Sequence, residues 1–480
     1  KQGRRCLPVA HIFCPSLYLQ FYQGYSMNTY EDFFFSFFTK ERITNEFEKY
    51  ILNSHSIGID KLTPANFVKL YPDYASYLHE KIISGTYRFS PYLEKLVLKG
   101  RNKKPRMLSI PCIRDKIILS CLNRYLQSIY FLCVNRALPN MRIRKLNNRI
   151  QHINHGSIIK LDIKNFFGSL DHSILKEKLN LCSCYAKQLI ISAITQITVP
   201  QNTPQSQYEN FSQSLGIPQG LSISNILAEI YINDFDTKTL HSALYYDRYV
   251  DDIIAITDIP NTFTKDTESL LKDIKLSLNN EKQQIAPLDS EITLSVTYLG
   301  YTIHNKKISP KKESFERYLR SLTKIFSLYS KNKQRAKRNN KEKILLDIFI
   351  DDLNTKIAGA IYHNKRYGWV FYFSALTDLQ YLFKIDAYIE KNINKLGMKY
   401  PGKIKKCTTA FFKIKSGNER SYAKKFDIDD PNEMRKVLVS REIIRPGETL
   451  DEDEIISRYK SYVRLTLADL EKDMDHGYAY

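Results

Sequence analysis

The sequence has no apolar stretch long enough to cross a lipid bilayer. The longest candidates, FFFSFF at residues 33–38 and LIISAITQITV at residues 189–199, are well short of the roughly 18 to 20 apolar residues that a spanning helix requires. Metal-binding cysteine motifs are also missing, because only Cys182 and Cys184 of the eight cysteines lie close together and no C-x-x-C pair occurs. These absences argue against a membrane partner and a zinc site, and they predict reduced thiols in a cytoplasmic protein.

Negative charge is in short supply as well. The chain has 72 Lys and Arg residues against 51 Asp and Glu residues, so its formal net charge is +21 and its pI is near 9.3. A surplus of this size attracts polyanions, and we expect a nucleic acid as the partner. The 33 Tyr and 25 Phe residues provide core material and also rings on which bases can stack.

The length of 480 residues allows two or three domains. Residues 1–26 precede the first methionine, and we expect them to be a leader or a cloning remnant without a fold of its own. Residues 27–155 have a helical pattern with one basic hairpin, and residues 156–305 alternate strands with helices. Residues 306–480 return to helical periodicity. The pattern predicts an α+β fold followed by a helical region.

Two adjacent aspartates, Asp251 and Asp252, interrupt an apolar and aromatic run at residues 245–256 (YYDRYVDDIIAI). The pattern predicts a β-hairpin whose turn carries both carboxylates. A plain turn explains the pair without any ligand. Alternatively, the hairpin presents the two charges to divalent cations, which would remove the repulsion between them.

A metal site of this kind needs a third carboxylate, and Asp162 is a candidate because it ends the strand-like run IIKLD at residues 158–162. An aspartate at such a position can equally cap the helical segment that follows. Between Asp162 and the aspartate pair, the sequence GIPQG at residues 216–220 predicts a turn that opens an amphipathic helix.

In order, spacing and surroundings, these three segments resemble the palm of a reverse transcriptase. Asp162 corresponds to the first palm motif, Pro218-Gln219-Gly220 to the second, and Tyr249-Val250-Asp251-Asp252 to the third. The resemblance covers about residues 56–305. Its other parts are a fingers segment at 106–118, a Leu-Asn-x-x-Lys motif at 276–284 and a primer-grip hairpin at 296–303.

Three further features are similar to bacterial enzymes related to group II intron reverse transcriptases, and most of all to the defence-associated, abortive-infection branch. They are Gly58-Ile59-Asp60, the run RYVDD and residues 365–389. The resemblance implies a right-handed polymerase fold with fingers at 27–155, a palm of antiparallel sheet and helices at 156–305, and a helical thumb and C-terminal extension at 306–480. It also implies RNA-directed DNA synthesis in antiphage defence.

The same resemblance implies nucleotidyl transfer with two Mg²⁺ ions, for which Mn²⁺ can substitute. Asp162 and Asp251 would bridge the ions, with Asp252 in support. Phe167 matches the aromatic gate that excludes the 2′-hydroxyl of a ribonucleotide, although the same ring could be core. Gln219 would line the pocket of the incoming nucleotide.

Three basic residues complete the implied site. Arg106 and Arg114 would hold the triphosphate, since arginine offers a bidentate fork to phosphate. The alternative for Arg114 is an ion pair with Asp115 at a helix start. Lys282 would donate a proton to pyrophosphate, or it is ordinary surface charge.

The expected partners are an RNA template, which a non-coding RNA could supply, deoxynucleoside triphosphates and the DNA product; the family also allows a homo-oligomer. Some relatives in the abortive-infection branch attach their product to the protein. Tyr478 and Tyr480, in the terminal sequence DHGYAY, are therefore candidate priming hydroxyls, with an ordinary frayed terminus as the alternative.

Two other functions fit the same palm, namely a maturase-like protein that binds structured RNA and an RNA-dependent RNA polymerase. The three aspartates argue against a purely structural palm, and Phe167 with the Pro-Gln-Gly turn favours deoxynucleotides. The sequence has no Cys/His cluster of an attached endonuclease and no evident four-carboxylate ribonuclease H pattern. A standalone enzyme is therefore favoured over a role in intron mobility.

Overall fold

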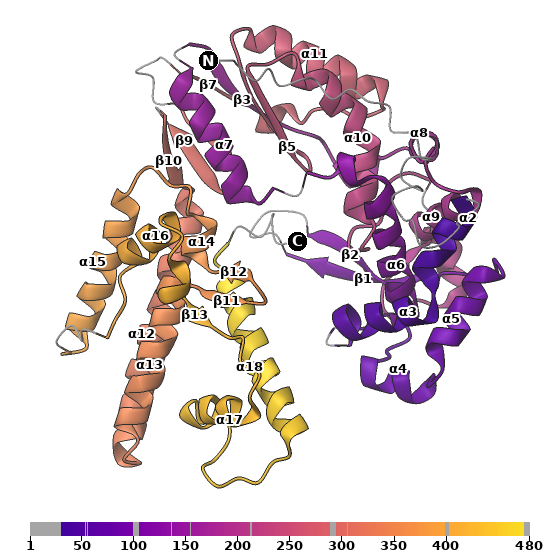
Figure 1. The fold of residues 1–480 in the computed structure, drawn as a ribbon. Coiled ribbons are helices and arrows are strands. Elements are labelled where there is room, and N and C mark those ends of the chain that lie inside the picture. The colour runs from indigo at the N-terminus through magenta and orange to yellow at the C-terminus, as the bar shows by residue number, and fades with distance from the viewer. Residues whose placement is uncertain are drawn as a thin grey trace, which may run out of the picture.

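The computed structural model describes residues 30–474, except for residues 53, 55, 99–104, 136, 154, 212–213, 289–293, 305 and 399–402. Figure 1 shows helical fingers at one side, a sheet flanked by long helices, and a second, mainly helical region opposite the fingers. The expected α+β polymerase fold is confirmed by this arrangement. No helix within the described ranges is both long and apolar enough to span a bilayer.

The fingers are helices packed around a small sheet. Helices α2 (Tyr30–Phe35), α3 (Lys40–Glu46), α4 (Pro64–Leu70) and α5 (Tyr74–Ile83) come first, followed by β1 (Tyr92–Val97), β2 (Arg106–Ile110) and α6 (Ile113–Ile129). β1 pairs antiparallel with β2, and β4 (Thr198–Val199) joins β1 on its other side. The basic hairpin before a long helix is therefore present as predicted.

The palm is built on a four-stranded antiparallel sheet in the order β5-β6-β3-β7. These strands are Tyr245–Tyr249, Asp252–Thr257, Ser157–Asp162 and Gln284–Pro287, in that order. The helices that flank the sheet are α7 (Pro139–His152), α10 (Ser224–Leu240) and α11 (Pro260–Asp273).

Strand β6 is buried on both faces, which explains its continuous apolar run. Because successive side chains of a strand point to opposite faces, Ile253 and Ala255 pack into one core, shared with residues of α10 and α11. Ile254 and Ile256 pack into a second core, shared with α7 and with the region after the palm. The strand that starts with Asp252 is thus fixed between two cores.

A second antiparallel sheet lies where the palm joins the helical region that follows it. β8 (Val296–Tyr298), β9 (Tyr301–His304) and β10 (Lys307–Pro310) lie in the order β10-β9-β8 and include the predicted primer-grip hairpin. The helices that follow are α12 (Lys312–Arg338), α13 (Glu342–Ala358), α14 (Trp369–Tyr372), α15 (Gln380–Lys395), α16 (Cys407–Lys415), α17 (Pro431–Ser440) and α18 (Glu452–Glu471).

A small sheet interrupts this helical region, and the sequence pattern did not predict it. β11 (Ala360–Tyr362), β12 (Lys365–Tyr367) and β13 (Lys424–Lys425) form it, with β11 at the centre. Strands of two or three residues are too short to produce a recognisable alternation of apolar and polar side chains. This is why only the helical periodicity was visible.

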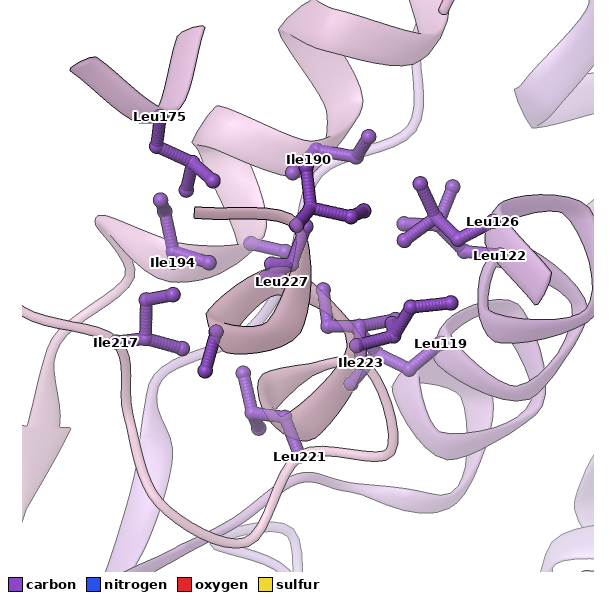
Figure 2. Close-up of a cluster of buried hydrophobic side chains, with 14 of the residues drawn as sticks. Leu119, Leu122, Leu126, Leu175, Ile190, Ile194, Ile217, Leu221, Ile223 and Leu227 are labelled. Carbon is purple, nitrogen blue, oxygen red and sulfur yellow. The ribbon is translucent and has the colours of Figure 1, made fainter. Parts of the chain in front are cut away.

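The core beneath the predicted Pro-Gln-Gly turn joins the fingers to the palm. Figure 2 shows side chains of α6, α8 (His172–Lys178) and α9 (Cys184–Ile194) meeting Ile217, Leu221, Ile223 and Leu227. Each of these four residues is at most 5% exposed. The turn is therefore anchored by buried apolar residues on both sides of Pro218-Gln219-Gly220.

Candidate active site

The three predicted carboxylates lie at one end of the palm sheet. Asp162 ends β3 and Asp252 begins β6, and the two residues are direct partners in the β3–β6 register. The backbone N–H of Ile163 donates to the carbonyl of Asp251 at 2.9 Å, which ties the hairpin turn to the end of β3. Two segments that are far apart in the sequence thus bring Asp162, Asp251 and Asp252 together.

The hairpin turn lies one residue earlier than the sequence predicted. Val250 and Asp251 form the turn, whereas Asp252 already pairs with Tyr249 across β5 and β6. Asp252 is drawn into the ladder because its neighbour β3 continues to Asp162. Val250 has a φ of +57°, which is an unfavourable backbone conformation for a β-branched residue.

The side chain of Asp162 does not act as a helix cap. It accepts hydrogen bonds from Lys282 Nζ, which lies 2.9 Å from both carboxylate oxygens, and from Asn279 Nδ2 at 3.3 Å. The cap of the helix that follows is Asp171, whose Oδ1 accepts from the backbone of Ser173 and Ile174. The capping alternative for Asp162 is therefore wrong.

Negative charge accumulates at this end of the sheet. Burial, and then the charges of Asp252 and Asp162, raise the pKa of Asp251 to about 6. Asp252 pairs with Lys160 Nζ at 2.9 Å. For Lys282, partial burial works to lower the pKa, but the hydrogen bond and charge of Asp162, followed by the charges of the aspartate pair, raise it overall.

The residues at this site suit a hard divalent cation by their chemistry. No group of three or more His, Cys, Asp or Glu side chains that could by itself hold a metal occurs in the part of the chain that the structure describes. Mg²⁺, however, binds through one or two carboxylates together with water and substrate oxygens. Asp162 and Asp251 offer such oxygens. The pKa of Asp251 is raised first by burial and then by the charges of Asp252 and Asp162, and a cation would neutralise those charges.

The Pro218-Gln219-Gly220 turn joins the fingers to the segment after β3. The backbone N–H of Ser109 in β2 donates to the carbonyl of Gln219 at 2.7 Å, and that of Ile217 donates to the carbonyl of Phe167 at 2.8 Å. Gly220 has a φ of +109°, and a Cβ built there would lie 2.8 Å from the carbonyl oxygen of Ser109. Only glycine meets both conditions at this position.

Two of the predicted nucleotide-binding residues contact one another. Arg106 Nε, from β2, donates to Oε1 of Gln219 in the turn.

Phe167 is 6% exposed and packs beside Phe166 in the core, with their ring centroids 5.6 Å apart. This position agrees with the core alternative, and its role as a sugar gate stays a prediction.

Arg114 is bound within the fingers. Its Nη2 donates to the carbonyl of Arg88 at 2.9 Å and to Ser90 Oγ at 2.8 Å. Its Nε lies 3.4 Å from Asp115 Oδ1 at the start of α6, so the helix-start ion pair is present. These interactions join Arg114 to neither Arg106 nor Gln219, and its role in triphosphate binding stays a prediction.

Sequence reasoning missed the role of Lys160 and of Arg248. Lys160 is two residues before Asp162, so the period of a strand places both side chains on one face, and Asp252 is the diagonal neighbour of Lys160 on β6. This alternation could have revealed Lys160. Arg248 is buried beside the turn, at 7% exposure. A single arginine within an apolar run gives no sign in the sequence that its side chain is buried.

The candidate priming residues Tyr478 and Tyr480 lie outside the described residues.

We expect Gly220→Ala to destabilise the protein more than Gly447→Ala. Both glycines have positive φ, but a Cβ at Gly447 meets nothing within 4 Å, whereas one at Gly220 would press on the backbone of Ser109. The left-handed conformation costs roughly 1–2 kcal/mol in either variant, and overpacking should add about 1–3 kcal/mol in the first alone. Urea unfolding of both variants measures the difference, and equal losses would contradict the proposed close packing.

The sequence that contains this site is similar to proteins of known family. Residues 97–303 match the family of reverse transcriptases (RNA-dependent DNA polymerases). Among curated proteins, the chain is 26% identical over 202 residues to the group II intron-encoded protein LtrA of Lactococcus lactis subsp. cremoris, covering 41% of this chain and 32% of the relative. The chain thus spans about a third of the length of the curated relatives that it matches.

Two telomerases are among the solved structures to which the chain is similar, each with a TM-score below 0.5. Apo telomerase from Candida tropicalis has a TM-score of 0.42 at 15% identity and covers 83% of this chain and 72% of its own. Telomerase from Candida albicans in complex with a telomeric RNA fragment has a TM-score of 0.40 at 12% identity, covering 85% and 68%. The segment that matches the reverse transcriptase family, residues 97–303, includes Asp162, the Pro-Gln-Gly turn and the aspartate pair.

Proposed function

We propose that this protein is an RNA-directed DNA polymerase that extends a primer with deoxynucleotides. The observation that carries the proposal is the arrangement of Asp162, Asp251 and Asp252 at one end of the palm sheet, inside the matched domain. The boundaries of fingers, palm and thumb follow the resemblance, at residues 27–155, 156–305 and 306–480. The antiphage role, a non-coding RNA template and assembly into a homo-oligomer are proposed on the resemblance alone.

Asp162 and Asp251 would hold two Mg²⁺ ions, with Asp252 in support. When bound, such ions lower the pKa of the primer 3′-hydroxyl and neutralise the charge of the leaving group. The chain contributes a rigid frame for the carboxylates, because β3 and β6 pair up to Asp162 and Asp252. Lys160 holds Asp252 from the same face of the sheet.

Lys282 is our candidate for the proton donor to pyrophosphate. Its raised pKa keeps the ammonium group charged, and its side chain is 57% exposed although it contacts Asp162. A flexible four-carbon stem lets such a group exchange one anionic partner for another. Arg106 would reach the triphosphate from β2, and Gln219 would contact the nucleotide beside it.

The C-terminal half of α12 would bind the phosphates of the RNA. Its last turns expose five cations within eight residues. These residues are Lys331, Lys333, Arg335, Lys337 and Arg338. Phosphate contacts of this kind position an RNA without reading its sequence.

The double change Asp251→Ala/Asp252→Ala should abolish Mg²⁺-dependent incorporation of deoxynucleotides on a primed RNA template. Both carboxylates would be needed to hold the ions, and the fold should persist because removing adjacent like charges relieves repulsion. Glu452→Ala/Asp453→Ala is the matched control, since it removes an adjacent and exposed acidic pair at the start of α18. Primer extension that survives in the first variant would refute the assignment.

Phe167→Ala should raise the incorporation of ribonucleotides relative to deoxynucleotides. The reason is steric, because a smaller side chain would no longer clash with the 2′-hydroxyl. Phe166→Ala removes the neighbouring buried ring, which is 3% exposed, and serves as the control for general loss of packing. Competition assays give the ratio, and the same ratio in both variants would leave Phe167 as a core residue.

RNA affinity should fall steeply with salt, because binding to phosphates releases counterions. Neutralising Lys331, Lys333, Arg335, Lys337 and Arg338 should flatten the plot of log affinity against log salt by about 0.7–0.9 for each phosphate that is no longer bound. Neutralising Lys238, Lys265 and Lys272, which are exposed on α10 and α11, should leave the slope unchanged. An equal change of slope in both sets of variants would mean that the RNA is attracted by the overall positive charge and not by the end of α12.

A further inference from the structure

Arg248 lies in β5, three residues before Asp251, and its guanidinium is saturated with hydrogen bonds. Arginine has five N–H donors in a rigid fork. Nε donates to Asp236 Oδ1 (2.8 Å), Nη1 to Glu229 Oε1 (3.2 Å) and the carbonyl of Val250 (2.7 Å), and Nη2 to Glu229 Oε2 (2.6 Å) and Asp236 Oδ2 (2.7 Å). All five donors therefore have a partner.

The two acidic partners fix the direction of this fork. Glu229 and Asp236 are seven residues apart on α10, so they lie on the same face of the helix, two turns apart. Tyr246 OH also donates to Asp236 at 2.6 Å, which holds that carboxylate in place from β5. Because α10 follows directly from the Pro-Gln-Gly turn, Arg248 links the second palm motif to the third.

The remaining bond of Arg248 reaches the hairpin turn itself. Val250 adopts a φ of +57°, a conformation that costs of order 1–3 kcal/mol for a residue of this kind. Its carbonyl accepts from Arg248, and the carbonyl of Asp251 accepts from Ile163. Both peptide units of the turn are thus held by a donor from outside it.

We propose that Arg248 is a positioning residue, which holds the strained Val250–Asp251 turn so that the Asp251 carboxylate stays beside Asp162. The role rests on the proposed function, since Asp251 is taken there as a ligand of the metal ions. Arg248 touches neither nucleotide nor metal in this role. It acts through the carbonyl of Val250.

Arg142 of α7 provides a comparison, because it contacts the same strand, β5, as a second buried arginine. It is also buried, at 3% exposure, and donates to Asp247 and to the carbonyl of Arg248, which is at 3.0 Å. None of these interactions of Arg142 reaches Val250 or Asp251. Loss of Arg142 should therefore disturb β5 without releasing the turn.

The experiment compares Arg248→Lys and Arg142→Lys, each alone and combined with Val250→Asn. Lysine keeps the charge but loses the fork, and asparagine adopts left-handed φ far more readily than valine. Hydrogen exchange of the 245–257 hairpin is read without metal or substrate, and the Mg²⁺ concentration for half-maximal synthesis is measured separately. Thermal melts verify folding.

We expect Arg248→Lys to accelerate exchange at Val250–Asp252 selectively and to raise the half-activating Mg²⁺ concentration by about 10- to 100-fold, as for other residues that orient metal ligands. Val250→Asn should restore both properties in this background. The effects of Arg142→Lys and Val250→Asn should simply add. Wild-type exchange at the turn in folded Arg248→Lys, or no restoration by Val250→Asn, would overturn the role of Arg248.

Failure of the proposed function is separable from failure of this inference. A wild-type protein that synthesises nothing refutes polymerase activity, while the exchange measurement still tests the turn. If Arg248→Lys does not fold, Glu229→Gln takes its place, because it removes a carboxylate that directs the guanidinium and keeps Arg248 itself. Its excess exchange should again be confined to the turn and be reversed by Val250→Asn, and exchange spread evenly over β5 would refute the proposal.

Discussion

The register between β3 and β6 is the constraint on which the rest of the site depends. It sets Asp162 opposite Asp252, although like charges directly opposite one another destabilise a sheet. The register cannot slip by one residue, because alternate side chains of β6 belong to two separate cores and a slip would exchange them. Apolar packing therefore imposes the acidic cluster, and buried residues outside the cluster maintain it.

The cations around this cluster differ in how firmly they are held. Lys160 has a side chain only 13% exposed and lies against Asp252 on the sheet, so it is part of the frame. Lys282 is 57% exposed and contacts Asp162 from a segment outside the sheet, so it can leave without disturbing the strands. Arg248 is the most deeply enclosed of the three and donates to the backbone carbonyl of Val250 instead of to one of the three clustered aspartates. The ion pair between Lys160 and Asp252 is therefore fixed by the sheet, whereas Lys282 can exchange Asp162 for another anion.

The sequence predicted the palm strands and the proximity of the three aspartates, because alternation, turn residues and motif order all indicated the same arrangement. It placed the hairpin turn one residue too late, since the strand pairing that draws Asp252 into β6 comes from β3, some 90 residues earlier. The saturated environment of Arg248 could not be predicted either. Its partners Glu229 and Asp236 look like ordinary helix charges until α10 is packed against β5.

The junction between β10 and α12 sets where the long basic helix begins. α12 starts two residues after β10 ends, and the backbone N–H of Lys311 donates to the carbonyl of Gly300 in the β8–β9 hairpin at 2.9 Å. A helix of 27 residues is about 40 Å long, so the cationic end of α12 lies about that far along the helix from this junction. Phe326 and Tyr329 of α12 pack against Phe349 of α13, so the helix pair carries the positive charge away from the hairpin beside the palm.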